Sequence, residues 1–260
     1  MSYQIQHRQQ KILDLLAGKE HLSVSELSKS LDVSEVTIRT DLNKLDKLGR
    51  IARMHGGAYL IEERLKQEYT FQTRKSLNNS SKQKIGALAA TLVNPSDCIL
   101  LDSSTTVLSL AHVLKKKNDL KEITVIPTGV WTAIELMGSS NINVLLPGGY
   151  LRHTTGSITG LPASDFFRDL IIQKAFLGAW GISYSLGLTD THLLEIELKK
   201  LIITKAREVI VMVDGSKFRQ IGLAAYAGIK QVTKIITDAS APAEEIEKIR
   251  DTGVEVLIAS

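Results

Sequence analysis

Apolar positions within residues 1–60 recur at helical spacing in three short segments, and polar residues mark where each segment begins. Residues 8–17 fit a first amphipathic helix. Ser23 followed by Glu26 has the spacing of a capping box, which predicts a second helix that runs to about Leu31. Ser34 is expected to cap a third helix that ends at Gly49. The residues expected to face the core from this third helix are Val36, Ile38, Leu42, Leu45 and Leu48, and Asp41 is expected on an exposed face.

From about residue 82 onward, short apolar runs alternate with helical patterns. Runs that are apolar on both faces and separated by helices are typical of buried parallel strands. We therefore predict an α/β fold in which a small winged helix-turn-helix precedes a larger domain with a mostly parallel sheet. The predicted strands are residues 98–101, 123–126, 144–146, 209–213 and 235–237.

The length and composition fit this two-domain organisation. The 260 residues are 43% hydrophobic and 23% charged, as in a globular protein with a sizeable core. Residues 61–81 are rich in charge, Gln, Asn and Ser, and we interpret them as a linker between the helix-turn-helix domain (1–60) and the α/β domain (82–260). Cys98 is the single cysteine, so no intramolecular disulfide forms, and its apolar neighbours indicate a core residue.

The third helix and the segment after it carry the residue types that contact DNA. In a helix-turn-helix the second helix of the motif enters the major groove with its N-terminal residues. Hydroxyl and basic side chains there contact bases and phosphates, and the glycine-punctuated basic hairpin that follows suits the adjoining backbone. The candidate DNA-binding residues are Ser34, Glu35, Thr37, Arg39, Thr40, Lys44, Arg50, Arg53 and His55. The alternative for this region is a helical protein-interaction domain with a solvated face.

Four segments that follow predicted strands indicate a ligand site in the α/β domain. Small hydroxyl residues at a strand-to-helix turn leave backbone N–H groups available for an anion. In open α/β sheets ligands collect at the carboxyl ends of strands, where all four segments fall. The candidate effector-binding residues are Asp102, Ser103, Ser104, Thr105, Thr106, Thr128, Gly148, Gly149, Arg152 and Lys217.

The motif at residues 33–42, together with the basic double-glycine segment at 49–58, resembles the winged helix of DeoR-type bacterial transcription regulators. Where that family usually has two adjacent arginines, this chain has Arg39 and Thr40. The resemblance continues through the α/β domain, which is similar in this family to ribose-5-phosphate isomerase. It implies a repressor of carbohydrate-metabolism genes that responds to a phosphorylated sugar, with residues 103–106 around the phosphate and with Asp102, Arg152 and Lys217 holding hydroxyls or charge.

Two other functions remain open. A sugar-phosphate isomerase fused to a DNA-binding module would need a general base beside the substrate carbon. Its available carboxylates, Asp102, Glu195, Glu197 and Asp214, are scattered singly along the sequence. A DNA-binding protein with a ligand-free oligomerisation domain is the third alternative.

The remaining expectations concern partners and location. One winged helix reads one half-site, so we expect a homo-oligomer, a dimer or tetramer, on a double-stranded operator. The six histidines show no metal-ligand spacing, and no catalytic residue, metal or cofactor is expected. The polar amino terminus and the lack of a membrane-length apolar run predict a cytoplasmic protein with no membrane partner.

Overall fold

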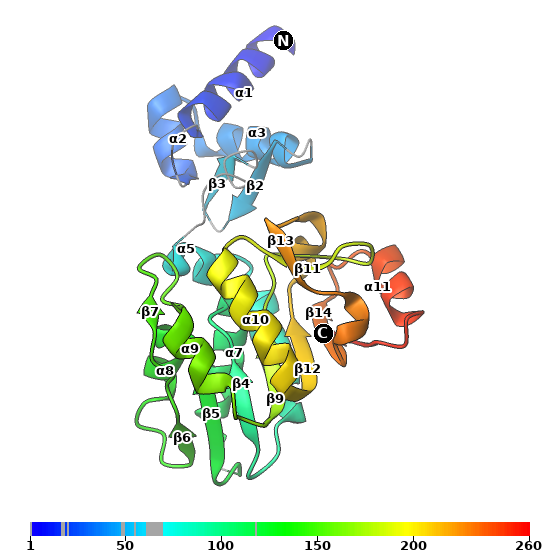
Figure 1. Ribbon diagram of the computed structural model, residues 1–260. Helices are drawn as coiled ribbons and strands as arrows, with labels where there is room; N and C mark the ends of the chain where they lie inside the picture. The colour runs from blue at the N-terminus through cyan, green and yellow to red at the C-terminus, as the bar shows by residue number, and fades with distance from the viewer. Residues whose placement is uncertain are drawn as a thin grey trace. The chain divides into compact units, whose positions relative to one another are not determined.

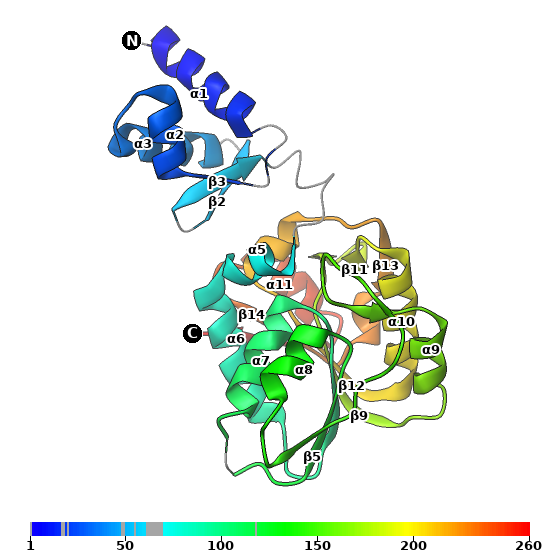
Figure 2. The same ribbon diagram turned by 90° about the vertical axis from the view of Figure 1, so that its left-hand side faces the viewer.

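The computed structural model divides into two compact units, residues 1–77 and 78–260. It describes residues 2–16, 19, 21–47, 50–54, 56–60, 70–117 and 119–260. Within these residues, no helix combines the length and apolar character needed to cross a membrane. Both units are drawn in Figures 1 and 2.

The first unit is a winged helix-turn-helix. Strands β2 and β3 form an antiparallel hairpin, and β1 adds to the β3 side in the order β1-β3-β2 (Figure 1). Its apolar core joins helices α1, α2 and α3 to this small sheet. The elements are α1 (Ser2–Leu16), β1 (Leu22–Ser23), α2 (Val24–Leu31), α3 (Glu35–Lys47), β2 (Ile51–Met54) and β3 (Gly57–Leu60).

Both predicted helix starts in the motif are confirmed by their hydrogen bonds. The Glu26 backbone N–H donates to Ser23 Oγ at 3.1 Å, and the Ser23 backbone N–H donates to the Glu26 carboxylate at 2.7 Å, which completes the capping box. Ser34 Oγ accepts from the Thr37 backbone N–H at 3.2 Å at the start of α3. Between the helices, Asp32 has φ of 52° and ends α2 in the left-handed conformation.

The predicted buried stripe of α3 is correct at Ile38 and Leu42 but wrong at Val36. The Val36 side chain is 70% exposed, because it lies two residues before Ile38, about 200° around the helix, whereas Leu42 falls one turn after Ile38. Asp41, expected on an exposed face, is 1% exposed and accepts from Arg8 Nε of α1 at 2.5 Å. Leu45 is buried as predicted, and Leu48 lies outside the described residues.

The double glycine of the wing is explained by backbone packing. Gly56 has φ of 82°, a conformation that side chains disfavour. A Cβ on Gly57 would lie 2.3 Å from the Leu22 carbonyl oxygen of β1, so a side chain there would force the sheet apart. His55, between β2 and the glycines, lies outside the described residues, as does Gly49.

Two helices lie within or overlap residues 61–81. Helix α5 (Phe71–Ser76) is followed by α6 (Asn79–Ala89), and the division between the two units falls between Leu77 and Asn78. Residues 61–69 lie outside the described residues.

The second unit is built on a seven-stranded parallel sheet, which confirms the predicted α/β fold class. Its order is β15-β14-β12-β9-β4-β5-β6. A three-stranded antiparallel sheet, β10-β11-β13, and a β7-β8 hairpin are added outside it. The strands are β4 (Cys98–Leu101), β5 (Ile123–Pro127), β6 (Ile142–Val144), β7 (Tyr150–Leu151), β8 (Ile158–Thr159), β9 (Ile172–Leu177), β10 (Gly181–Ser183), β11 (Gly187–Asp190), β12 (Ala206–Met212), β13 (Ala224–Ala227), β14 (Lys234–Asp238) and β15 (Glu255–Ala259).

Helices cover both faces of the large sheet (Figures 1 and 2). Alternate residues of the central strands divide between two apolar cores: Leu100 of β4 belongs to the core shared with α9, α10 and α11, and Leu101 to the core shared with α6, α7 and α8. Burial on both faces explains why these strands read as continuous apolar runs. The helices are α7 (Thr105–Leu114), α8 (Val130–Leu136), α9 (Leu161–Phe167), α10 (Leu193–Lys205) and α11 (Ala243–Arg250), with 3-10 helices η1 (Ala90–Leu92), η2 (Gly215–Arg219) and η3 (Ile229–Gln231).

Candidate functional site

The exposed face of α3 carries the residues predicted to contact DNA. All of the predicted residues on this helix are exposed except Thr37, which is half-buried. The Arg39 guanidinium donates to the Glu35 carboxylate at 2.9 Å, one turn back along the helix. This ion pair is exposed, so solvent screens it and it leaves Arg39 available to exchange partners. The residues concerned are Ser34, Glu35, Thr37, Arg39, Thr40 and Lys44.

The wing adds cations next to α3. Arg53 of β2 donates to the Asn43 side chain of α3, which holds the strand and the helix in contact. Arg50 precedes β2 and is exposed, and its backbone N–H donates to the Leu45 carbonyl at the end of α3. The structure therefore brings Arg50 and Arg53 beside the recognition helix; the predicted contribution of His55 lies outside the described residues.

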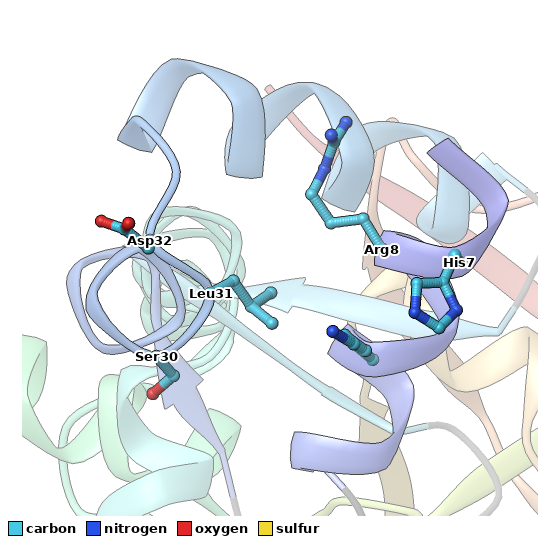
Figure 3. Close-up of a pocket in the computed structure, with 6 residues that line it drawn as sticks. His7, Arg8, Ser30, Leu31 and Asp32 are labelled. Carbon is cyan, nitrogen blue, oxygen red and sulfur yellow. The ribbon is translucent and has the colours of Figure 1, made fainter. Parts of the chain in front are cut away.

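A surface cavity lies between α1 and the end of α2 (Figure 3). It contains none of the predicted DNA-binding residues. Arg8, on its edge, extends towards α3, where it holds the buried Asp41. Its lining residues are His7, Arg8, Lys11, Ser30, Leu31 and Asp32.

The predicted effector-binding segments meet at the carboxyl edge of the parallel sheet. Strand β4 leads into Asp102, and Ser104 caps α7 by accepting from the Val107 backbone N–H at 3.1 Å. Thr128 follows β5, and its backbone N–H donates to the Leu101 carbonyl at 2.9 Å. A Cβ on Gly129 would lie 2.9 Å from Ser103 Cα, so the two turns are in close contact.

Four largely buried residues of these turns have hydroxyls that make no side-chain hydrogen bond within the described residues. Their oxygen atoms are not fully enclosed by the protein, so they can still bond to solvent or to a ligand. Two of the four are the first residues of α7 and a third precedes its N-cap, where the helix dipole and unbonded N–H groups favour an anion. The turn can therefore donate several hydrogen bonds to one anionic or hydroxylated molecule. The four residues are Ser103, Thr105, Thr106 and Thr128.

A buried ammonium group fixes the position of this turn. Lys199 Nζ of α10 lies 2.7 Å from the Asp190 carboxylate, 3.1 Å from the Asp102 carboxylate and 2.8 Å from the Gly178 carbonyl oxygen. Burial disfavours the charged amine, but the two carboxylates outweigh burial and raise the pKa of Lys199 well above that of a free lysine. Asp102 Oδ1 accepts from the Ser104 backbone N–H, and Asp102 Oδ2, the oxygen that faces Lys199, also accepts from the Gly178 backbone N–H.

Tyr226 of β13 closes the other side of this cluster. Its hydroxyl donates to the Gly178 carbonyl oxygen at 2.9 Å, and its ring lies 5.0 Å from Lys199 Nζ. Burial raises the pKa of Tyr226, so the phenol stays protonated and continues to donate. Two carboxylates that lie far apart along the chain, Asp102 and Asp190, therefore share one lysine.

Arg152 does not project freely as an anion clamp, because it pairs with Glu195 of α10. The same carboxylate accepts from Ser157 Oγ at 2.6 Å and lies 3.4 Å from Thr155 Oγ1. This cluster bridges α10 to the segment that follows the β7 strand. Arg152 thus holds the neighbouring backbone in place while its charge is neutralised within the protein.

The two glycines of the predicted effector-binding segment, Gly148 and Gly149, differ in whether the structure has room for a side chain. Gly149 has φ of 151°, and a Cβ there would lie 2.6 Å from the Thr159 carbonyl oxygen, so packing against β8 explains this glycine. Gly148 has open space around its Cα and no such constraint.

Lys217 and Asp214 form a third charged group at the carboxyl end of β12. Lys217 Nζ lies 5.4 Å from the ring of Trp180, which is a cation–π contact. Asp214 accepts from Asn78 Nδ2 at 2.9 Å and from the Ser216 backbone N–H at 3.0 Å. Burial acts to raise the pKa of Asp214, but the Lys217 charge and the Ser216 hydrogen bonds reverse this, and the net pKa is lowered.

The sequence alone suggested no role for Lys199 of α10 or Asp190 of β11, and it suggested Glu195 only as a possible general base. Glu195 and Lys199 stand one turn apart, on the same stripe as the buried Ile202. A charged pair on an apolar stripe is the signal that would have identified them, since buried charges are paired. The charge partners of this pair come from distant segments, which spacing along the sequence does not reveal.

Comparisons with known proteins agree with this division into two units. Residues 8–64 match the DeoR-like helix-turn-helix domain, and residues 77–239 match the DeoR C terminal sensor domain. The HTH-type transcriptional regulator GolR of Listeria innocua is 35% identical and aligns over 97% of this chain and 98% of its own length. The putative aga operon transcriptional repressor of Escherichia coli O157:H7 is 29% identical, with 96% and 93% covered.

Among solved structures, ribose 5-phosphate isomerase A from Methanocaldococcus jannaschii is similar over 54% of this chain and 54% of its own, with 20% identity and a TM-score of 0.40. The family assignment does not depend on this partial likeness, because two family models together span both units and the regulators align along nearly the whole chain. The chain belongs to the DeoR family of helix-turn-helix transcription regulators.

Proposed function

We propose that this chain represses carbohydrate-metabolism genes and that a phosphorylated sugar, bound at the carboxyl edge of the seven-stranded sheet, sets its affinity for the operator. The observation that supports the effector proposal is the group of four largely buried residues, at the start of α7 and after β5, whose hydroxyls have no side-chain partner within the described residues. A phosphate accepts several hydrogen bonds at a helix N-terminus, and sugar hydroxyls match further donors and acceptors. The name of the aga operon relative supports repression.

The effector changes operator affinity only if it binds the DNA-competent and DNA-incompetent states with different affinity. We further propose that the chain acts as a homo-oligomer in the cytoplasm, where its operator lies, because one winged helix reads one half-site.

An isomerase activity is not part of this proposal. A general base must reach the proton that it abstracts. The Asp102 oxygens are occupied by Lys199 and two backbone N–H groups, and Glu195 is occupied by Arg152 and Ser157. These carboxylates are therefore organised to hold the protein together.

A thermal-shift screen with sugar phosphates and their unphosphorylated parents tests the effector proposal. A ligand that binds only the folded protein raises the midpoint temperature of unfolding, Tm. At a ligand concentration of 100 times Kd, the free energy of unfolding rises by about 2.7 kcal/mol. We expect at least one sugar phosphate to raise Tm while its parent sugar does not. A complete absence of shifts would contradict the effector proposal and favour a ligand-free oligomerisation domain.

Thr105→Ala separates binding at this turn from a shift caused elsewhere. It removes one of the four hydroxyls, so it should weaken the Tm response and leave operator affinity without effector unchanged. Ser109→Ala is the matched control, because Ser109 lies one turn further along α7 and donates to the Thr105 carbonyl. Equal responses in both variants would place the ligand elsewhere.

A further inference from the structure

The exposed face of α3 presents more apolar surface than its sequence indicates, because its hydroxyls are engaged within the helix. Ser34 Oγ and Thr37 Oγ1 are hydrogen-bonded to each other at 2.9 Å. Thr40 Oγ1 donates to the Val36 carbonyl oxygen at 2.9 Å. A hydroxyl bonded back to its own helix leaves the methyl group as the exposed part of the threonine side chain.

Val36 lies at the centre of this face. It is the second residue of α3, and its side chain is 70% exposed. Thr40 follows one turn later on the same face, so the valine methyls and the threonine methyl form a short apolar strip. The packing of the first unit does not account for this valine, because the core of that unit is built on the opposite side of α3.

Basic side chains lie on α3 and on the adjoining wing, and the Glu35 carboxylate beside the strip is paired with Arg39. Arg39 and Lys44 are exposed on α3, and Arg50 and Arg53 lie on the adjoining wing. An apolar strip with cations around it is complementary to a DNA groove, where phosphates line the edges and base edges form the floor. In the major groove, the group that an aliphatic side chain contacts favourably is the C5-methyl of thymine.

We propose that Val36 is a specificity-determining residue that contacts the methyl group of a thymine in each operator half-site, with the Thr40 methyl extending the contact. This rests on the proposed DNA-binding function and adds to it the chemical feature that is recognised. The N-terminal position of Val36 in the recognition helix is where base-edge contacts are made.

The test compares thymine with uracil, which lacks only the C5-methyl. A high-affinity operator is first selected from random-sequence DNA with the full-length protein, and each thymine in it is then replaced by deoxyuridine in turn. Loss of one buried methyl corresponds to about 0.8 kcal/mol, so the wild-type Kd should rise about fourfold at the contacted thymine. Uracil at thymines outside the half-site serves as the DNA control.

Val36→Ala, combined with the uracil substitution, completes a double-mutant cycle between the side chain and the thymine methyl. Because Val36 is exposed and alanine favours helix, the variant should fold with unchanged Tm. It should bind the thymine operator about fourfold more weakly and show no further loss with uracil at the contacted position. Thr40→Ser removes the neighbouring methyl while keeping a hydroxyl able to bond the Val36 carbonyl, and should give a smaller loss.

The outcomes separate this inference from the proposed function. Failure to select any DNA sequence would contradict DNA-binding function itself. Selective binding that is insensitive to uracil at every position would overturn the inference alone. It would also be overturned if Val36→Ala retained the full uracil effect, since the two losses would then be independent; the exposed valine would in that case serve a protein contact.

Discussion

The two units differ in the solvent exposure of their functional polar residues. In the DNA-binding unit the functional side chains lie on the exposed face of α3 and the wing, and their ion pair, Glu35 with Arg39, is exposed to solvent. In the sensor unit the charged groups around the turn before α7 are buried, and Lys199 holds Asp102 and Asp190 within 3.1 Å. DNA binding needs cations that can leave water for phosphates, whereas the proposed effector site needs a turn held rigidly before the ligand arrives.

The largest test of this comparison removes the buried cation. Lys199→Met leaves two carboxylates without their shared partner, and breaking one side of a buried ion pair costs about 3–5 kcal/mol. We expect a large fall in the urea midpoint of the sensor unit. Lys200→Met is the control, because Lys200 is adjacent and exposed, and it should change stability by less than about 0.5 kcal/mol. Similar losses of stability in the two variants would show that the ion pairs of Lys199 with Asp102 and Asp190 do not stabilise the sensor unit.

The corresponding test in the DNA-binding unit removes an exposed cation. Arg39→Ala should leave Tm unchanged and weaken operator binding about tenfold, about 1.4 kcal/mol, with a shallower dependence of Kd on salt. Its effect is on binding because its ion pair with Glu35 is screened by solvent. Lys230→Ala, an exposed lysine of the sensor unit, controls for net charge. Unchanged affinity in Arg39→Ala would place the DNA contact on another face.

The capping box gives a smaller and purely local effect. Ser23→Ala removes the acceptor for the Glu26 N–H, which costs about 1 kcal/mol of stability in the DNA-binding unit. Tm should fall, while effector-induced shifts stay the same. Ser25→Ala, at an exposed position two residues on, should have no measurable effect on Tm.

The smallest effect concerns pH. The pKa of Asp214 is lowered in the folded protein from its ordinary 3.8, so its stabilising contribution is complete above about pH 3.8 and is lost as the pH falls through the lower, folded value. In Asp214→Asn the free energy of unfolding should therefore fall less steeply below that pH than it does in the wild type. The effect of the substitution on stability should depend little on pH near neutrality. A variant with the same acid profile as the wild type would show that Lys217 does not stabilise the Asp214 charge.

The same contrast explains what could be predicted from the sequence. The helix starts at Ser23 and Ser34 depend on residues three apart, and the central strands are continuous apolar runs, so local patterns were sufficient. Strand β9, at the centre of the sheet, was not predicted, because the polar Gln173 and Lys174 interrupt its apolar pattern.

Within the sites, local reasoning failed where the partner is distant. Val36 was assigned to the core although its angle around the helix places it outside, and Asp41 was assigned to solvent although Arg8 of another helix neutralises it. The clamp prediction for Arg152 used its local sequence alone, and the ion pair of Arg152 with Glu195, 43 residues further along the chain, was not predicted. Burying a charge requires a partner, and only the tertiary fold brings that partner into contact.

The most direct test of the account is a titration of the selected operator with full-length protein, with and without each sugar phosphate that raises Tm. The account predicts that a sugar phosphate changes the operator Kd by about 5–150-fold, the usual range of coupling between sites, while the unphosphorylated sugar leaves it unchanged. Thr105→Ala should lose this coupling and keep the basal Kd. A sugar phosphate that stabilises the protein but leaves the operator Kd unchanged would contradict the claim that this site controls DNA binding.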